Sequence, residues 1–138
     1  MKNSSNLLDF FGIPISEYTR KQAIDDGVLI DITEFSKQFG FCIPVAMTNT
    51  VWEDCVSWTE IDNKRQTFQD ELGRLTDVLT MARFSIRKNN NVNRLAFQVY
   101  RIPAKGRGIK PKLVELHMHI GPGDNAEPVI TIMMPNED

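Results

Sequence analysis

Apolar residues in the middle of the chain recur with the period of an α-helix. Six of them follow one another at intervals of four, three, four, three and four: Phe68, Leu72, Leu75, Leu79, Ala82 and Ile86. This spacing places all six on one face of a helix. We therefore predict one long amphipathic helix over about residues 66–88, in which Gly73 costs about 1 kcal/mol relative to alanine.

After residue 93 the period of the pattern changes to two, because apolar and polar residues then alternate. Alternation is typical of a strand with one buried face and predicts strands over about 94–102 and 113–120. The apolar run at about 129–134 predicts a third strand, and Gly-Pro-Gly-Asp-Asn at 121–125 is a strong turn signal before it. Short connections favour an antiparallel meander with the long helix across one face, which is an α+β fold.

The first half of the chain predicts shorter elements, separated by capping residues and glycines. Short helices are expected at about 17–26, 34–39 and 51–58, and strands at about 28–32 and 41–47. The expected N-caps are Ser16, Thr33 and the segment Thr48-Asn49-Thr50, while Gly27 and Gly40 close the first two helices. Pro44 confines the second strand to a sheet edge or to a first-residue position.

Chain length bounds the domain organisation. A chain of 138 residues is close to the commonest domain size and buries roughly two thirds of its unfolded surface. We predict one α+β domain over residues 16–138, preceded by a segment, residues 1–15, that is partly disordered or docked. No apolar run approaches the ~18 residues of a membrane span. Cys42 and Cys55 lack metal or redox spacing, so two buried thiols in a reducing cytoplasm are expected.

Charge is distributed unevenly along the chain. The formal net charge is −2, yet residues 83–112 hold nine of the sixteen basic residues and no acidic residue, whereas the remainder holds seven basic and eighteen acidic residues. The candidates for a basic patch are Arg83, Arg87, Lys88, Arg94, Arg101, Lys105, Arg107, Lys110 and Lys112. Helix and strand geometry allow these residues to converge on one edge.

Three interpretations of this patch stay open. The acidic remainder of the fold can neutralise it, it can bind phosphate or nucleic acid directly, or it can dock an acidic host protein or nucleoprotein surface. No RNP1, KH, zinc-finger or helix-turn-helix pattern accompanies it. We predict a non-catalytic binding protein, with direct nucleic-acid binding as an alternative. The patch supports binding only if its loop residues Lys105, Arg107 and Lys110 stay unpaired.

A second candidate site is the segment Glu115-x-His117-x-His119. A strand places these side chains on one face, with neighbours about 7 Å and the end members about 13 Å apart. Two imidazoles and a carboxylate can bind a divalent metal with open positions, so a metal-dependent enzyme is the other alternative. Three in-line residues are too widely spaced to complete a compact site by themselves. The simpler interpretation is that Glu115, His117 and His119 form an exposed polar face of the sheet. Apart from this candidate divalent metal, no cofactor is expected.

Other signatures of catalysis are missing from the sequence. It contains no Gly-x-Ser-x-Gly elbow and no phosphate-binding glycine loop with a following Lys-Ser or Lys-Thr. Glu53 and Asp54 directly precede Cys55 and are expected to raise its thiol pKa rather than lower it. Catalysis is therefore less expected than binding.

Four parts of the sequence carry a family resemblance. They are Tyr18–Asp31 (YTRKQAIDDGVLID), Pro44–Thr48 with Val51-Trp52, Gly73–Leu79 with Met81–Arg83, and Gly121–Asp124 with Glu127–Met133. Together they resemble a family of short bacterial and mobile-element proteins that is known only as a domain of unknown function. The resemblance implies no assigned reaction or site. It implies a setting in plasmids, integrative elements and phages, from which an anti-defence role is expected, such as anti-CRISPR or anti-restriction inhibition.

Overall fold

A computed structural model describes residues 18–88 and 93–137. Its helical elements are α1 (Arg20–Asp25), α2 (Thr33–Ser36), η1 (Lys37–Phe39), α3 (Asn49–Val51), the π-helical turn η2 (Trp52–Val56), α4 (Glu60–Arg65) and α5 (Glu71–Lys88). Its strands are β1 (Leu29–Asp31), β2 (Val45–Thr48), β3 (Arg94–Arg101), β4 (Lys112–Pro122) and β5 (Pro128–Met133). The expectation for residues 1–15 lies outside the described residues.

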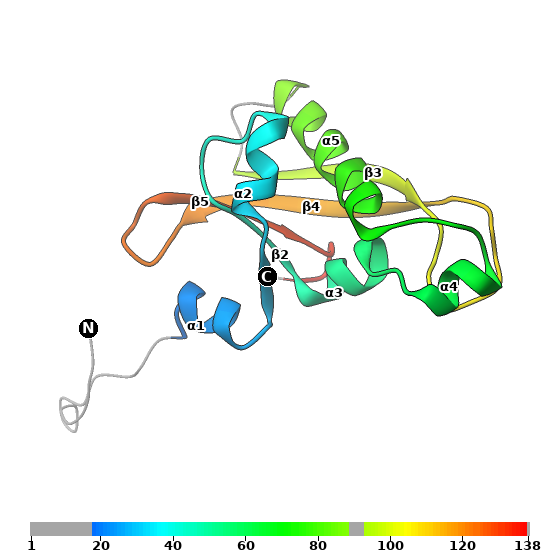
Figure 1. The fold of residues 1–138 in the computed structure, drawn as a ribbon. Helices are drawn as coiled ribbons and strands as arrows, with labels where there is room; N and C mark the ends of the chain where they lie inside the picture. Colours follow the sequence, from blue (N-terminus) through cyan, green and yellow to red (C-terminus); the bar gives the residue numbers. More distant parts are fainter. Residues whose placement is uncertain (1–17, 89–92, 138) are drawn as a thin grey trace.

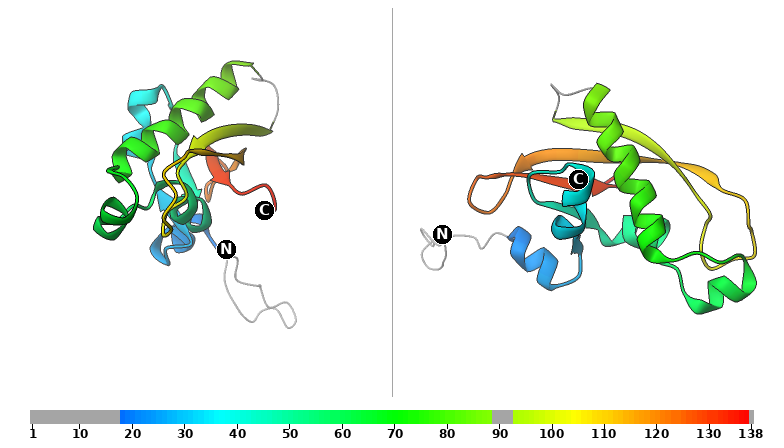
Figure 2. Two further views of the ribbon diagram at one scale, coloured as in Figure 1. Left: turned by 90° about the vertical axis from the view of Figure 1, so that its right-hand side faces the viewer. Right: turned by 45° about the horizontal axis from the view of Figure 1, so that its top comes forward.

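One mixed sheet gathers the described strands in the order β1-β2-β5-β4-β3. Strands β3, β4 and β5 form the predicted antiparallel meander. Strand β2 pairs parallel to β5, and β1 pairs antiparallel to β2, so the N-terminal strands extend the same sheet. Helix α5 lies across one face of this sheet (Figures 1 and 2). The predicted α+β class is therefore confirmed, with five strands in the sheet.

The core lies between α5 and the sheet face that it covers. Leu79 of the helix is fully buried, as are Leu116 and Met118 of the central strand β4. In β3, Leu95 and Phe97 are buried while Ala96 between them is exposed, as the alternating pattern predicts. The period of two thus separates a core face from an outer face, which carries Glu115, His117 and His119.

The long helix begins later than predicted, at Glu71 rather than near residue 66. Asp70 Oδ1 accepts a hydrogen bond from the Gly73 N–H at 2.7 Å, which is the geometry of an N-cap and starts the helix at the next residue. Phe68 therefore lies outside the helix and is 79% exposed, and Leu72 in the first turn is 63% exposed. The additional helix α4 precedes α5 and is capped by a reciprocal Thr59–Asp62 box.

The N-terminal elements confirm the predicted order of helices and strands, with shifted boundaries. The N-cap of α1 is Thr19, in a capping box with Gln22, whereas Ser16 lies outside the described residues. Pro44 directly precedes β2, the first-residue arrangement that lets a proline border an internal strand. Gly40 closes η1 with φ at 93°, a left-handed conformation that glycine adopts without strain.

Helix α1 is docked onto the β4–β5 hairpin by Asp124. The two carboxylate oxygens of Asp124 accept hydrogen bonds from the backbone N–H groups of Arg20 and Lys21, at 2.8 and 3.0 Å. The Arg20 guanidinium donates to Thr131 Oγ1 and to the Ile130 carbonyl, both at 2.7 Å. The start of α1 and the Gly-Pro-Gly-Asp turn are therefore hydrogen-bonded to each other, although they lie 103 to 104 residues apart in the sequence. We call this contact the Asp124 clamp.

Asp124→Ala is expected to lower the free energy of unfolding by about 1 kcal/mol, because it removes the acceptor of two helix N-terminal amides. Urea unfolding followed by circular dichroism measures this loss. Asn125→Ala is the matched control, since the Asn125 side chain makes no hydrogen bond in the described part of the chain. Equal destabilisation by the two variants would contradict the clamp.

Candidate functional site

The nine basic candidates divide into two groups at opposite ends of the edge strand β3. Arg94 and Arg101 are its first and last residues, about 23 Å apart by strand rise. The C-terminal end of α5 lies near the start of β3, whereas the loop that follows β3 lies at the other side of the molecule, beside α4 (Figure 1). The structure therefore brings the basic residues together within each group but not into one patch.

The first group comprises Arg83, Arg87, Lys88 and Arg94, and two of its members, Arg83 and Arg94, make contacts within the fold. Arg94 Nε donates to His117 Nδ1 at 3.0 Å, and its Nη2 donates to the carbonyls of Pro135 and Glu137, so it holds the C-terminal tail against β4. Arg83 is half-buried and packs against Gly40, where an added Cβ would lie 3.0 Å from the Arg83 Nε. Arg87 is exposed on the last turns of α5. The side chain of Lys88 lies outside the described part of the chain.

Two members of the second group are neutralised by acids of the η2 turn. Arg101 forms an ion pair with Asp54 at 3.1 Å, and its side chain is largely buried. Lys105 Nζ contacts Glu53 Oε1 at 3.2 Å, with both side chains exposed. A surface pair of this kind contributes about 0–1 kcal/mol. The condition set for the three loop residues therefore fails for Lys105, which is neutralised within the fold. Of these three residues, only Arg107 and Lys110 have no partner among the described residues and can support binding.

The loop at 103–111 is held by side-chain hydrogen bonds from Asp62 in α4 and from Gln66, the residue that follows α4. The Gln66 amide donates to the carbonyls of Pro103 and Gly108, at 2.8 and 2.6 Å, and accepts from the Gly106 N–H at 3.3 Å. Asp62 Oδ1 accepts from the Lys105 N–H at 2.9 Å. A loop rich in glycine and lysine is thereby held in one conformation.

Asp62 is a buried carboxylate whose charge is stabilised by hydrogen bonds. Burial by itself would raise its pKa, but hydrogen bonds from the Thr59 and Lys105 N–H groups and from the Thr59 hydroxyl outweigh burial. The pKa of Asp62 is therefore lowered from its ordinary value. The ionised form of Asp62 links α4 to the loop.

Three basic side chains of the loop region face solvent without a hydrogen bond or ion pair to another described residue: Arg107, Lys110 and Lys112. They line a hollow of about 460 Å³. Apolar side chains lie beside them, because Tyr100 is 64% exposed, Ile109 is 59% exposed, and Leu113 pairs with Tyr100 across β3 and β4. We call these six residues the basic loop surface.

Glu115 and His117 interact on the outer face of β4. His117 Nε2 lies 3.1 Å from Glu115 Oε2, and its Nδ1 accepts the hydrogen bond from Arg94. Since Nδ1 accepts, the proton of the neutral ring lies on Nε2, which donates to Glu115. Both ring nitrogens of His117 are thus already engaged.

His119 lies further along β4, with its ring against Gly121, where a Cβ would come within 2.6 Å of His119 Cε1. Among the described residues, no cluster of three or more His, Cys, Asp or Glu side chains is arranged to hold a metal ion. A metal at His117 would have to displace Arg94 or Glu115. The metal-dependent enzyme stays a prediction without a supporting contact.

The two cysteines differ in their surroundings. Cys55 is buried, and burial, followed by the adjacent Asp54 carboxylate, raises the pKa of its thiol to about 12. This direction was predicted from the neighbouring acids. Cys42 is exposed, so the expectation of two buried thiols is wrong for this residue. Strand β2 begins only at Val45, which leaves Cys42 in the preceding loop.

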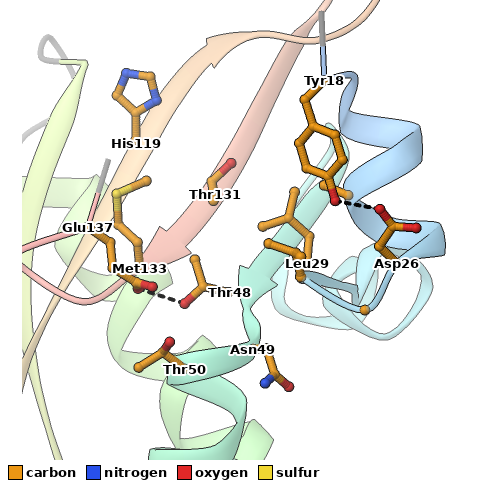
Figure 3. Close-up of a pocket in the computed structure, with 13 residues that line it drawn as sticks. Tyr18, Asp26, Leu29, Thr48, Asn49, Thr50, His119, Thr131, Met133 and Glu137 are labelled. Carbon is orange, nitrogen blue, oxygen red and sulfur yellow. Dashed lines mark hydrogen bonds between the residues drawn. The ribbon is translucent and has the colours of Figure 1, made fainter.

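A hollow of about 910 Å³ lies between α1, the start of α3 and the outer face of the sheet. Figure 3 shows Tyr18 and Asp26 on one side and His119, Thr131 and Met133 on the other. The Tyr18 hydroxyl donates to Asp26 at 2.8 Å, and the Thr48 hydroxyl donates to Glu137 at 2.8 Å. Four of its polar side chains are paired with one another in this way, whereas Asn49, Thr50 and His119 also line the hollow and their side chains make no hydrogen bond to another described residue.

Sequence reasoning missed the polar residues that support the basic loop surface. Asp62 belongs to a Thr59-x-x-Asp62 capping box, a signal that was available from the sequence. Arg74 is buried although it is charged, and its place four residues before Val78 puts it beside the apolar stripe of α5. Gln66 carries no such signal, since its partners lie some forty residues later in the chain.

No helix among the described residues combines the length and apolar character needed to cross a membrane. The chain has no significant match among curated proteins or among solved structures. Residues 8–138 match the sequence model of a family of unknown function, DUF6573. This match agrees with the resemblance to an uncharacterised family, and because it covers nearly the whole length, the chain belongs to the family DUF6573.

Proposed function

We propose that this chain is a non-catalytic binding protein that docks an acidic partner protein through the basic loop surface. The observation that carries the proposal is the combination of Arg107, Lys110 and Lys112, unpaired within the described residues, with the exposed Tyr100 and Leu113. The loop backbone is held in place by Asp62 and Gln66, so binding needs little further ordering of the backbone that carries these charges.

The apolar members of the surface favour a protein over a nucleic acid. Protein interfaces are enriched in tyrosine and arginine around a desolvated centre, whereas interfaces with DNA are more polar and more strongly basic. Ile109 and Leu113 have no role in contacting phosphates. Basic side chains around an exposed tyrosine and two aliphatic residues therefore match an acidic protein surface with an apolar centre. The setting in a mobile genetic element and an anti-defence role remain proposals that rest on the resemblance alone.

The test is a charge reversal of the three free cations, Arg107→Glu, Lys110→Glu and Lys112→Glu, in one variant. Immobilised protein is exposed to nuclease-treated bacterial lysate, and retained proteins are quantified by mass spectrometry. We expect an acidic protein that the wild type retains and the variant loses at least tenfold, because three attractive charges become repulsive. The matched control is Lys21→Glu, Lys37→Glu and Lys64→Glu, which makes the same net charge change elsewhere and should retain the partner.

Two outcomes would overturn the proposal. Identical retained proteins for the wild type and the loop variant would show that the loop surface is not the binding site. Retention that occurs from a parallel untreated lysate but not from the nuclease-treated one, together with a salt-sensitive gel shift of DNA that the loop variant abolishes, would assign the surface to nucleic acid instead.

A further inference from the structure

Arg74 is a charged residue in the interior of the fold, with only 4% of its surface exposed. Its Nε donates to the Val56 carbonyl at 3.0 Å, and its Nη1 donates to the Ile102 carbonyl at 2.9 Å and to Gln69 Oε1 at 2.7 Å. The guanidinium carbon lies 4.6 Å from the centroid of the Trp58 ring, over its face. These contacts fix the position and orientation of the cation.

The other terminal nitrogen of Arg74, Nη2, is buried and has no hydrogen-bond partner among the described residues. No described carboxylate lies within ion-pair distance of this guanidinium. A buried donor without an acceptor costs about 1–3 kcal/mol, and more when the group is charged. Buried arginines are almost always paired. The donor is unsatisfied within the described chain, so an acceptor supplied by a ligand or by a water molecule would stabilise it.

A cavity of about 220 Å³ lies beside Arg74, between α5, the η2 turn and the end of β3. Arg101 also lines it, and burial together with the nearby Arg101 charge lowers the pKa of Arg74. Arg101 is already paired with Asp54 on one side. Asp77 lines the same cavity as a carboxylate, and burial raises its pKa although Arg74 acts to lower it. Cys55, with a thiol pKa of about 12, is neutral there.

We infer that this cavity binds one carboxylate group of a ligand, placed between Arg74 and Arg101. Two guanidinium groups that line one cavity repel each other, and a single negative charge between them offsets this repulsion. The cavity is larger than the roughly 30 Å³ that one water occupies in the liquid, so a carboxylate with a short carbon chain fits beside Val78 and Val99.

Charge decides between a carboxylate and a phosphate. The lining contains two cations and the carboxylate of Asp77, and Arg101 is also paired with Asp54, so negative charge is already present beside the site. A phosphate dianion would leave Asp77 facing two additional negative charges. The site is therefore expected to prefer a monocarboxylate over phosphate. Tyr100 borders both this cavity and the basic loop surface, so the carboxylate can be a free small acid or an acidic side chain of a docked partner.

The test is a nuclear magnetic resonance titration of the full chain with acetate at constant ionic strength. The probes are the Arg74 Nε–H, which its hydrogen bond to Val56 protects, and the backbone amides of Tyr100 to Ile102. We expect saturable shifts with acetate, at least tenfold weaker binding of inorganic phosphate, and no shifts with the neutral isostere acetamide. A glutamate-containing peptide whose other residues are neutral tests the side-chain source, and shifts with acetate alone would assign the site to a free acid.

Asp77→Asn is the decisive variant, because it removes the negative charge that competes with the ligand. Asp77 is exposed at the cavity rim, so the fold should tolerate the change. We expect acetate to bind on the order of fivefold tighter. If Arg74 only stabilises the fold and binds no ligand, Asp77→Asn should not increase the affinity for acetate. Arg74→Met should abolish the shifts. If that variant does not fold, the gain in Asp77→Asn still tests the inference.

The result is separable from the proposed function. The loop variant with Arg107→Glu, Lys110→Glu and Lys112→Glu should keep the acetate shifts, because none of these side chains lines the cavity. Linear shifts that chloride reproduces, phosphate binding as strong as acetate binding, or unchanged acetate affinity in Asp77→Asn would each overturn the inference. In that case a water molecule is the partner of Arg74 Nη2.

Discussion

Leu79→Ala is expected to lower the free energy of unfolding by about 3 kcal/mol, within the 2–5 kcal/mol range for large-to-small core substitutions. Leu79 is 0% exposed and lies at the centre of the contact between α5 and the sheet. Removing its terminal carbons leaves a cavity that neighbouring β-strands cannot close, because strand spacing is fixed by backbone hydrogen bonds. Urea unfolding at neutral pH, followed by circular dichroism, measures the change.

Leu72→Ala is the matched control on the same helix. It removes the same atoms from a residue that is 63% exposed, so we expect a change of about 0.5 kcal/mol or less. The periodic pattern alone assigns Leu72 and Leu79 to the same apolar face. Equal losses in the two variants would support that assignment and contradict the observed start of α5 at Glu71.

Asp62→Asn is expected to lower the free energy of unfolding by about 2–3 kcal/mol at pH 7. Hydrogen bonds to a charged acceptor are worth about 1.5–3 kcal/mol, and the substitution weakens or removes several of them at a buried position. Asp62 Oδ2 accepts from the Thr59 N–H and hydroxyl, and its Oδ1 accepts from the Lys105 N–H. An amide nitrogen in place of one oxygen cannot accept these bonds. Hydrogen exchange of the Lys105 and Gly106 amides should accelerate, because the loop loses its attachment to α4.

The same residue predicts how stability depends on pH. The folded pKa of Asp62 is lowered from 3.8, so the unfolded chain binds a proton more readily than the folded one. The contribution of Asp62 is therefore complete above pH 3.8 and is lost as the pH falls through the lower folded pKa. The free energy of unfolding of the wild type should fall more steeply in this acid range than that of Asp62→Asn.

Asp77 provides a control of opposite sign. Partial burial raises the pKa of Asp77, so the stability it contributes is present below pH 3.8 and is lost as the pH rises through the folded pKa. In Asp77→Asn the free energy of unfolding should no longer fall as the pH rises through this range. Its steep fall at acid pH, which is due to Asp62, should be unchanged. If Asp62→Asn and the wild type decline in parallel below pH 4, the hydrogen bonds of Asp62 do not hold its pKa down.

Local patterns were sufficient to predict most secondary structure. The 3.6-residue period locates the buried face of α5 at Leu75, Leu79 and Ala82, and the two-residue period separates Leu95 and Phe97 from the outer face of β3. Such periods follow from the geometry of one segment, in which residues four apart in a helix or two apart in a strand share a face. They do not fix where a helix begins, because Asp70 caps α5 by a single side-chain contact.

The basic segment shows most clearly what only the tertiary structure decided. The sequence by itself established that residues 83–112 hold nine cations and no acid. It did not establish which of them are free. Arg101 meets Asp54 and Lys105 meets Glu53 across 47 and 52 residues of chain, whereas Arg107 meets no acid among the described residues. Pairing between distant charges depends on which segments the sheet and helices bring within a few ångströms, and Coulomb energy falls with that distance rather than with separation along the sequence.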